Sequence, residues 1–220
     1  MEQLGKESES MPSSFEPLCA FDCATKALRA GLAVVFPTDT VYGLGISVAH
    51  AHTPEVLYAI KQRDRGKPIA WLVGSVDDLY HFGKEIPEWA RILAQQFWPG
   101  DLTLVVRAAD TVPEAFRSDA GTIGLRMPRS SYALRLIKEL GAPLATTSAN
   151  RSGAPDVASY DALDSHIAAS AGAVIPGWDV VSEGVSSTVV DASSDVPQIM
   201  RAGARVELVR QELVRSGVSF

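Results

Sequence analysis

Cysteine is scarce in this chain of 220 residues, which contains only Cys19 and Cys23. The two residues lie four apart on one face of a predicted helix, which is neither a metal-binding nor a redox spacing. No second Cys/His pair is present to complete a zinc site, and the four histidines form no zinc set. We therefore predict no metal site and interpret both cysteines as small core residues.

Long apolar runs and targeting signals are missing as well. No run of apolar residues reaches the length that crosses a bilayer. The first residues, MEQLGKESESMPSSFEP, are polar and partly acidic, whereas a secretory signal needs a basic start and an apolar middle. We expect residues 1–17 to be a flexible tail of a cytoplasmic protein that does not associate with membranes.

Positive charge is in deficit. The chain has 20 Lys and Arg residues against 26 Asp and Glu residues, a formal net charge of −6. This balance does not indicate that the protein as a whole attracts nucleic acid electrostatically, although it does not exclude a local basic face.

Three motifs that would assign a chemistry directly are absent. The chain has no G-x-x-x-x-G-K-[ST] phosphate loop, and the GLG at residues 43–45 does not extend to G-x-G-x-x-G. It also has no G-x-S-x-G nucleophile elbow. A site must therefore be assembled from separate segments.

Apolar residues make up 46% of the chain and charged residues 21%, which is ordinary for one large globular domain. Apolar runs typical of strands alternate with periodic segments typical of helices. Strands are predicted at 31–37, 68–74, 102–108, 122–128, 142–150, 173–177 and 187–193. Helices are predicted at 20–30, 53–63 (with Thr53 as the N-cap), 75–83, 86–97, 130–141 and 159–172, while 206–220 suits a strand or a helix. The alternation predicts an α/β fold with helices packed on a twisted sheet.

Several predicted strands run into polar loops that carry glycine or proline. The segments are FPTDTVYGLG (36–45), RMPRSS (126–131) and TTSANRSG (146–153). Because ligands of open α/β sheets collect outside strand ends, we expect one site formed by these loops.

Alternating cations follow the predicted helix at 53–63. Lys61, Arg63, Arg65 and Lys67 are two apart in IKQRDRGKP (60–68), and in extended chain such residues share a face. Up to four cations along one edge suit a polyphosphate. A solvated helix end, with cations near the negative pole of the helix dipole, explains the same pattern equally well.

Two further segments have open interpretations. The hydroxyls and amide of TTSANRSG suit a nucleotide's phosphates or a ligand's amine, but they also suit turns and helix caps. Arg126 interrupts an apolar strand, so its guanidinium needs a partner or a cavity. Either a structural salt bridge or a bound carboxylate satisfies that need.

Seven segments together resemble the YrdC/TsaC family of threonylcarbamoyl-AMP synthases. They are PTDTVYGLG, KQRDRGKP, WPGDLT, GLRMP, TSANRSG, SSTVVD and RAG, in the family's order. The resemblance covers about residues 18–210, with 211–220 left as a C-terminal tail. It implies an α/β YrdC-like fold, a twisted mixed sheet with surrounding helices and a large basic cavity, in the family's short single-domain form.

The resemblance also implies the activity. L-Threonine, bicarbonate or CO₂, and ATP would give L-threonylcarbamoyladenylate and pyrophosphate, the first step of threonylcarbamoyl-adenosine formation in tRNA. That reaction makes the protein a nucleotidyltransferase. Mg²⁺ would accompany ATP, held by phosphates and water. A downstream tRNA threonylcarbamoyl transferase complex and weak tRNA binding would complete its partners.

The resemblance assigns roles by position. The signature residues expected to be catalytic are Lys61, Arg63, Ser148 and Asn150. The residues expected at ATP are Arg63, Lys67, Thr122, Ser148 and Arg201, with Lys61 also at the phosphates. The residues expected at threonine are Thr40, Arg126, Thr146 and Ser187.

Two other functions remain open at this stage. A non-catalytic RNA-binding module would use the same basic cavity, although the net charge and the lack of an aromatic stacking platform argue against it. An enzyme that uses carbamoyl phosphate on the same fold is disfavoured, because such proteins embed the domain in a longer chain with zinc-binding cysteines.

Overall fold

The structure is a computed structural model that describes residues 16–177 and 182–218. The strands are β1 (Val34–Phe36), β2 (Gly43–Ser47), β3 (Ala70–Leu72), β4 (Gly83–Lys84), β5 (Leu102–Ala108), β6 (Thr122–Arg126), β7 (Leu144–Ser148), β8 (Ala173–Val174), β9 (Thr188–Asp191) and β10 (Gln198–Arg201). The helices are α1 (Glu16–Arg29), α2 (Glu55–Lys61), α3 (Asp78–Phe82), α4 (Glu88–Phe97), α5 (Ser131–Leu140), α6 (Ser165–Ser170) and α7 (Val206–Arg215), with short 3₁₀ turns at Glu114–Phe116 and Tyr160–Ala162.

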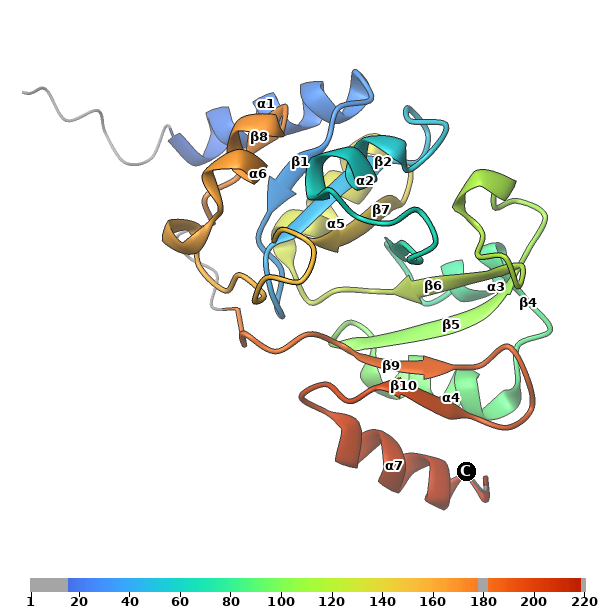
Figure 1. The fold of residues 1–220 in the computed structure, drawn as a ribbon. Coiled ribbons are helices and arrows are strands. Elements are labelled where there is room, and N and C mark those ends of the chain that lie inside the picture. The colour runs from blue at the N-terminus through green and yellow to red at the C-terminus, as the bar shows by residue number, and fades with distance from the viewer. Residues whose placement is uncertain (1–15, 178–181, 219–220) are drawn as a thin grey trace, which may run out of the picture.

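All the described strands belong to one twisted sheet (Figure 1). Their order is β10-β9-β5-β6-β3-β7-β2-β1-β8, and β4 pairs with β5. The pairs β3/β6, β5/β9 and β1/β8 are parallel, and the remaining pairs are antiparallel. The predicted α/β fold with a mixed sheet and surrounding helices is therefore confirmed.

Apolar side chains cover both faces of the sheet in different ways. On one face, Trp71, Leu104 and Leu125 belong to the larger core, which also includes side chains of α2, α4 and α7. On the other face, Leu72 and Leu144 join a smaller core with side chains of α1 and α5. Side chains alternate along a strand, so the residues two positions away from Leu72 and Leu144 lie on the same face. These residues are not covered by the smaller core. That uncovered part of the face carries the site described below.

Capping residues set the ends of helix α5. In α5 the Ser130 hydroxyl accepts a hydrogen bond from the Ala133 N–H, and Gly141 ends the helix in the left-handed conformation with φ +63°. Helix α7 packs against α4 at the end of the sheet that holds β9 and β10 (Figure 1). No helix within the described ranges combines the length and the apolar character needed to span a bilayer.

Four local predictions differ from the structure. Strand β2 lies in a segment that we predicted as a loop, and the helix predicted at 159–172 is a 3₁₀ turn followed by α6, which Asp164 caps. Pro54, not Thr53, is the N-cap residue of α2. Cys23 is exposed rather than part of the core, and the side chain of Cys19 lies outside the described residues.

The predicted domain boundary at residue 210 falls inside α7. Glu212 and Leu213 are buried on this helix, so residues 211–215 are part of the packed fold and not a separate tail. At the other end, α1 begins at Glu16, within the predicted tail of residues 1–17, and the preceding residues lie outside the described ranges.

Candidate active site

A cavity of about 480 Å³ lies over the uncovered part of the second sheet face. Its floor follows the period of two that pleated strands impose: Ala70 and Leu72 on β3, Thr122, Gly124 and Arg126 on β6. Eight of the residues predicted from the sequence line it, namely Thr40, Arg63, Thr122, Arg126, Thr146, Ser148, Ser187 and Arg201. The cavity therefore unites the predicted site, but it lies across the sheet face and is not confined to the strand ends that we expected.

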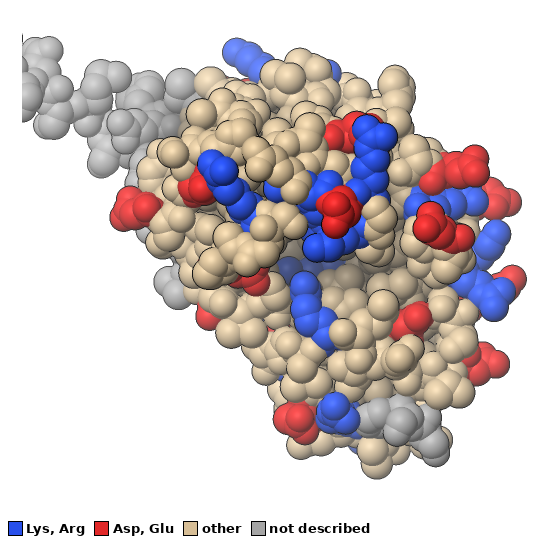
Figure 2. Space-filling view, viewed as in Figure 1, with Lys and Arg blue, Asp and Glu red and all other residues tan. Residues whose placement is uncertain are grey.

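The cations at this cavity are arginines. Arg63, Arg126 and Arg201 line it, and Asp191 is the single carboxylate residue among the lining residues that the structure describes. Figure 2 shows lysine and arginine side chains gathered around a hollow on this face of the molecule. An excess of positive charge in a recessed cavity attracts anionic ligands more strongly than the same charges do on an open surface.

Arg126 is buried and held by three oxygen atoms. Its Nε donates to the Gly100 carbonyl at 2.8 Å, Nη1 to the Thr40 hydroxyl at 2.8 Å, and Nη2 to Asp39 Oδ1 at 2.6 Å. Burial lowers the pKa of Arg126, and the Asp39 carboxylate raises it. The two interpretations of this arginine are compatible, because the salt bridge to Asp39 uses one N–H of Nη2 and a guanidinium carries five.

The loop that presents Thr40 is fixed by a second segment of the chain. The Thr38 hydroxyl donates to the Val41 carbonyl at 2.6 Å and lies 3.1 Å from the Thr40 hydroxyl. The backbone N–H groups of Glu183 and Gly184 donate to the Asp39 and Thr40 carbonyls at 3.0 Å and 2.8 Å. Residues 182–184 therefore hold the loop in place. This contact joins segments that are distant in the sequence, and no sequence pattern predicts it.

Arg63 enters the cavity from the loop that follows α2. Its Nη1 donates to the Thr147 hydroxyl at 2.9 Å and its Nη2 to the Pro68 carbonyl at 3.3 Å. The buried Nε has no hydrogen-bond partner among residues 16–177 and 182–218. Burial lowers the pKa of this guanidinium. An unpaired buried donor on a cation is costly, so the geometry suits an incoming anion.

Lys61 lies behind the cavity wall rather than on it. It is 2% exposed, and its ammonium donates to the carbonyls of Ser148 and Asn150 and to Asn150 Oδ1. The Asn150 Oδ1 also accepts from the Ser148 hydroxyl at 2.6 Å. Lys61 and Asn150 thus hold the end of β7 together and present Ser148 to the cavity, so we assign them positions in the supporting structure.

The cations of residues 60–68 do not share one edge. Lys61 ends α2, Gln62 is left-handed with φ +51°, and the chain then turns. Arg65 pairs with Glu55 on the surface, as expected of a cation outside the site. Lys67 is exposed and does not line the cavity. Of the four cations, Arg63 is the one that lines it.

Ser187 and Arg201 form a small hydrogen-bonded group with Thr103. The Ser187 and Thr103 hydroxyls lie 2.8 Å apart, and Arg201 donates to the Ser187 carbonyl and hydroxyl, each at 2.9 Å. Partial burial lowers the pKa of Arg201, Asp156 raises it, and the charges of Arg126 and Arg63 lower it further. The positive charges of the three arginines are therefore close enough to affect one another within the cavity.

Three residues with site contacts were missed by the sequence analysis as site residues. Asp39 holds Arg126, Thr147 holds Arg63, and Thr103 holds Ser187. Asp39 and Thr147 lie next to predicted residues in two of the polar segments, which is the signal that was available for them. Thr103 ends the family segment WPGDLT, but it also begins a regular apolar strand, and we did not single it out.

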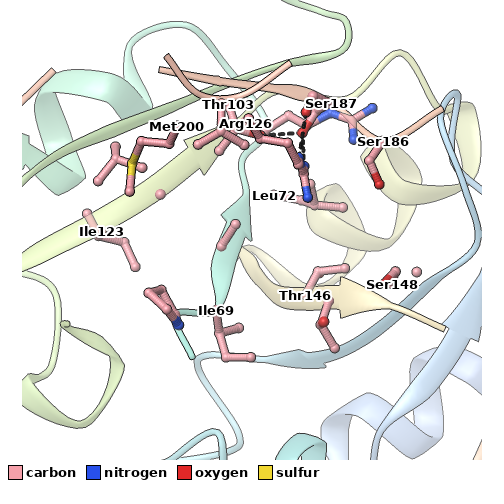
Figure 3. Close-up of a pocket in the computed structure, with 18 of the residues that line it drawn as sticks. Ile69, Leu72, Thr103, Ile123, Arg126, Thr146, Ser148, Ser186, Ser187 and Met200 are labelled. Atoms are coloured by element: carbon pink, nitrogen blue, oxygen red, sulfur yellow. Dashed lines mark hydrogen bonds between the residues drawn. The ribbon is translucent and has the colours of Figure 1, made fainter. Parts of the chain in front are cut away.

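The two ends of the cavity differ in chemistry (Figure 3). Thr146, Ser148, Ser186, Ser187 and Arg126 lie toward one end, whereas Ile69, Ile123 and Met200 lie toward the other. A ligand with a charged part and an apolar part would match this division.

The fold and the site define an α/β domain with a cavity on the face of a mixed sheet, lined by arginines, hydroxyls and apolar side chains, which suits an anionic, partly apolar ligand. The model of the family Sua5_yciO_yrdC, described as "Telomere recombination", matches residues 26–203. The match spans most of the chain, and the chain therefore belongs to the Sua5/YciO/YrdC family.

Individual relatives agree with the family assignment. A threonylcarbamoyl-AMP synthase of Pyrococcus abyssi is 36% identical over 176 residues, which cover 80% of this chain and 52% of the relative. A protein of Mycobacterium leprae is 37% identical over 180 residues, covering 82% of this chain and 81% of its own. The crystal structure of Pyrococcus abyssi Sua5 with L-threonine matches with a TM-score of 0.77 and 34% identity, covering 87% of this chain and 57% of that one. The chain thus spans about half the length of the Pyrococcus relative.

Proposed function

We propose that this chain is a threonylcarbamoyl-AMP synthase, a nucleotidyltransferase that makes L-threonylcarbamoyladenylate and pyrophosphate from L-threonine, bicarbonate or CO₂, and ATP. The observation that carries the proposal is the convergence on one cavity of three arginines and five Ser or Thr residues, all predicted from the sequence and drawn from six separate segments. The relatives named as this synthase, and the threonine bound to Pyrococcus Sua5, support the same conclusion.

The proposed chemistry begins at the threonine amine. The neutral amine adds to CO₂ and releases a proton to solvent, which gives a carbamate, and a carbamate oxygen attacks the α-phosphorus of ATP. The new P–O bond forms as the bond from the α-phosphorus to the bridging oxygen breaks, and pyrophosphate carries that electron pair away. The protein forms no covalent intermediate, so positioning and charge neutralisation supply the rate enhancement.

Each part of the cavity then has a role in this proposal. Arg126, fixed by Asp39 and the Thr40 hydroxyl, receives the threonine carboxylate or the carbamate. Arg63, with its unpaired Nε, and Arg201 neutralise the triphosphate. Thr146 and Ser148 lie between the two substrates, with Thr122 on the nucleotide side.

The roles of Lys61, Asn150 and Lys67 differ from those that the resemblance implied. Lys61 and Asn150 act through the end of β7, because their polar groups are engaged with each other and with Ser148. Lys67 remains available only for an extended triphosphate that leaves the cavity. We therefore propose Lys61 and Asn150 as positioning residues.

A protein-held Mg²⁺ does not fit this site. The described residues contain no group of three or more His, Cys, Asp and Glu side chains able to hold an ion. We expect Mg²⁺ to enter with ATP on phosphate oxygens and water. The proposal also includes a cytoplasmic location, weak tRNA binding and transfer of the product to a tRNA threonylcarbamoyl transferase complex.

The direct test is pyrophosphate release by the purified chain. With ATP and Mg²⁺ present, we expect release to require both L-threonine and bicarbonate. Arg126→Gln should raise the KM for threonine, whereas Arg107→Gln, a control at an exposed pair with Glu85, should leave it unchanged. Pyrophosphate release that ignores threonine would refute the proposal. tRNA binding with a steep salt dependence and no ATP turnover would favour the RNA-binding module instead.

A further inference from the structure

The apolar end of the cavity has a flat floor. Val105, Gly124 and Ala70 lie side by side on neighbouring strands, since Val105 pairs with Gly124 and Gly124 with Ala70. Their side chains are small or absent, so the floor carries no projection. Met200 lies beside this floor (Figure 3). A planar heteroaromatic ring fits such a surface by dispersion and burial.

Gly124 leaves space that the fold itself does not need. A Cβ atom built there would have ordinary contacts, 3.4 Å to the Ala70 Cβ and 3.5 Å to the Thr103 Cγ2, and its φ is not in the left-handed region. Neither packing nor backbone conformation therefore requires glycine at this position. The space above it belongs to the cavity.

Asp191 is the single carboxylate in the described cavity lining, and it lies at the same end. Strand β9 alternates, with Thr188 and Val190 buried and Val189 and Asp191 facing the cavity, and Asp191 pairs with Val105 of the floor. The Ser193 N–H donates to Asp191 Oδ1 at 2.8 Å, which fixes the carboxylate. For Oδ2, no hydrogen bond is found within the described residues. An ionised carboxylate only accepts hydrogen bonds, so a ligand beside it must present a donor.

We propose that Asp191 selects the base of the nucleotide, and that its Oδ2 accepts a hydrogen bond from the exocyclic amine of adenine lying on the floor of Val105, Gly124 and Ala70. The proposal deepens the proposed function and rests on it, since ATP is taken as the nucleotide. Guanine and hypoxanthine carry a carbonyl oxygen at that position. An acceptor facing a carboxylate is repelled and leaves both groups unpaired, which is the strongest form of discrimination by a small site.

The orientation follows from the other end of the cavity. Arg126, Arg201 and the hydroxyls that suit threonine occupy the polar end. Arg63 reaches the cavity between the Thr147 hydroxyl and the Pro68 carbonyl. A nucleotide whose phosphates contact these arginines can therefore extend its base toward the apolar end. Met200, 60% exposed on β10, can adjust over the ring because its thioether side chain is unbranched and flexible. The competing role for Asp191 is a hydrogen bond from a ribose hydroxyl.

The test compares three nucleotides on the wild type, two test variants and one control variant by isothermal titration calorimetry without threonine. The nucleotides are ATP, inosine triphosphate and 2′-deoxyadenosine triphosphate. We expect the wild-type protein to bind ATP at least about tenfold more tightly than inosine triphosphate. In Asp191→Asn, whose amide offers either a donor or an acceptor, that ratio should fall about tenfold. Asp156→Asn, a carboxylate outside the cavity lining, is the matched control and should keep the wild-type ratio.

Gly124→Ala supplies a second variant with an intact fold. The added methyl group projects from the floor, so we expect ATP and inosine triphosphate to weaken together and their ratio to stay unchanged. Circular dichroism and the melting temperature should match those of the wild type. If Gly124→Ala binds ATP as tightly as the wild type, the adenine ring does not lie on this floor, and the proposal is wrong.

The outcomes separate the base assignment from the proposed function. An unchanged ATP to inosine triphosphate ratio in Asp191→Asn overturns the base assignment. So does a variant in which only the ratio of ATP to 2′-deoxyadenosine triphosphate changes, because that result places Asp191 at the ribose. If the ratios change as expected but pyrophosphate release never depends on threonine, the proposed function fails and the base assignment stands.

Discussion

Arg126 and Asp39 form a nearly buried ion pair, with Nη2 and Oδ1 2.6 Å apart and side-chain exposures of 8% and 13%. The pair joins β6 to the loop after β1 beside the cavity. Because Asp39 does not itself line the cavity, its contribution is to fix the arginine that does. The ion pair is thus part of the fold and of the site at once.

Removing the charge of Asp39 should cost stability as well as orientation. Asp39→Asn keeps an acceptor of the same shape but leaves Arg126 without a buried counter-charge. We expect the free energy of unfolding to fall by about 2 kcal/mol, measured by urea denaturation at pH 7. Glu85→Gln breaks the exposed pair with Arg107 and should cost less than about 1 kcal/mol. Equal losses in the two variants would contradict the structural role of the buried pair.

The contact between Arg63 and Thr147 should control the affinity for ATP. Thr147→Val keeps the shape of the side chain but removes the oxygen that accepts from Arg63 Nη1. The guanidinium is then less well oriented toward the phosphates, so we expect the KM for ATP to rise about three- to tenfold and the KM for threonine to stay constant. Thr147→Ser retains the hydroxyl and should behave like the wild type. A change in the threonine KM alone would place Arg63 at the other substrate.

Gly203 should tolerate no side chain. A Cβ atom there would lie 2.3 Å from the Thr188 N and 2.5 Å from the Ser186 carbonyl oxygen, both backbone atoms that cannot rotate away. Gly203→Ala should therefore push apart Arg201 and the Ser187 segment, lowering the free energy of unfolding by about 2–3 kcal/mol and weakening ATP binding. Gly66→Ala, with nothing within 4 Å and no left-handed backbone, is the control and should change stability by less than about 0.5 kcal/mol. Similar melting temperatures for both variants would rule out the close approach.

Local signals predicted the regular elements well where sequence and tertiary environment agree. Strand β5 occupies residues 102–108 as predicted, and α5 ends at the predicted Gly141. Strand β2 was missed because its glycines suggest a loop. Position 45 requires glycine because the Phe36 ring and the Thr146 hydroxyl fill the space that a side chain would take. Each would lie 2.9 Å from an added Cβ. That packing explains the glycine.

The site could be predicted as a set of residues but not as a geometry. Thr40, Arg126 and Ser148 lie on separate segments, and their order along the chain is enough to identify them. Which cations face the cavity depends on how the chain turns at Gln62, and sequence spacing does not encode that turn. Lys61 looked equivalent to Arg63 in the sequence, yet its position against the end of β7 buries it.

Lys61 should make nucleotide binding depend on pH. Burial, with the charge of Arg63 added and that of Asp156 opposing, lowers the pKa of Lys61 to about 8. Below that pH the ammonium has three donors for the three oxygens of Ser148 and Asn150. Above it the amine has two donors and a lone pair that faces an oxygen, and the positive charge behind the cavity wall is lost. The affinity for ATP should therefore fall severalfold between pH 7 and pH 9, and Lys61→Met should bind weakly with no such step.

The same shift has a defined effect on stability, which provides an independent measurement. The folded-state pKa of about 8 lies below the ordinary value of 10.5, so between these values the unfolded chain binds more protons than the folded one. Through this group alone, the free energy of unfolding of the wild type should rise with pH relative to Lys61→Met across that window. The comparison needs urea titrations of both proteins at several pH values, with ATP affinity measured in parallel and threonine omitted because its amine also titrates. A stability difference that stays constant from pH 7 to pH 10 would show that Lys61 keeps its proton, and the loss of ATP affinity would then need another cause.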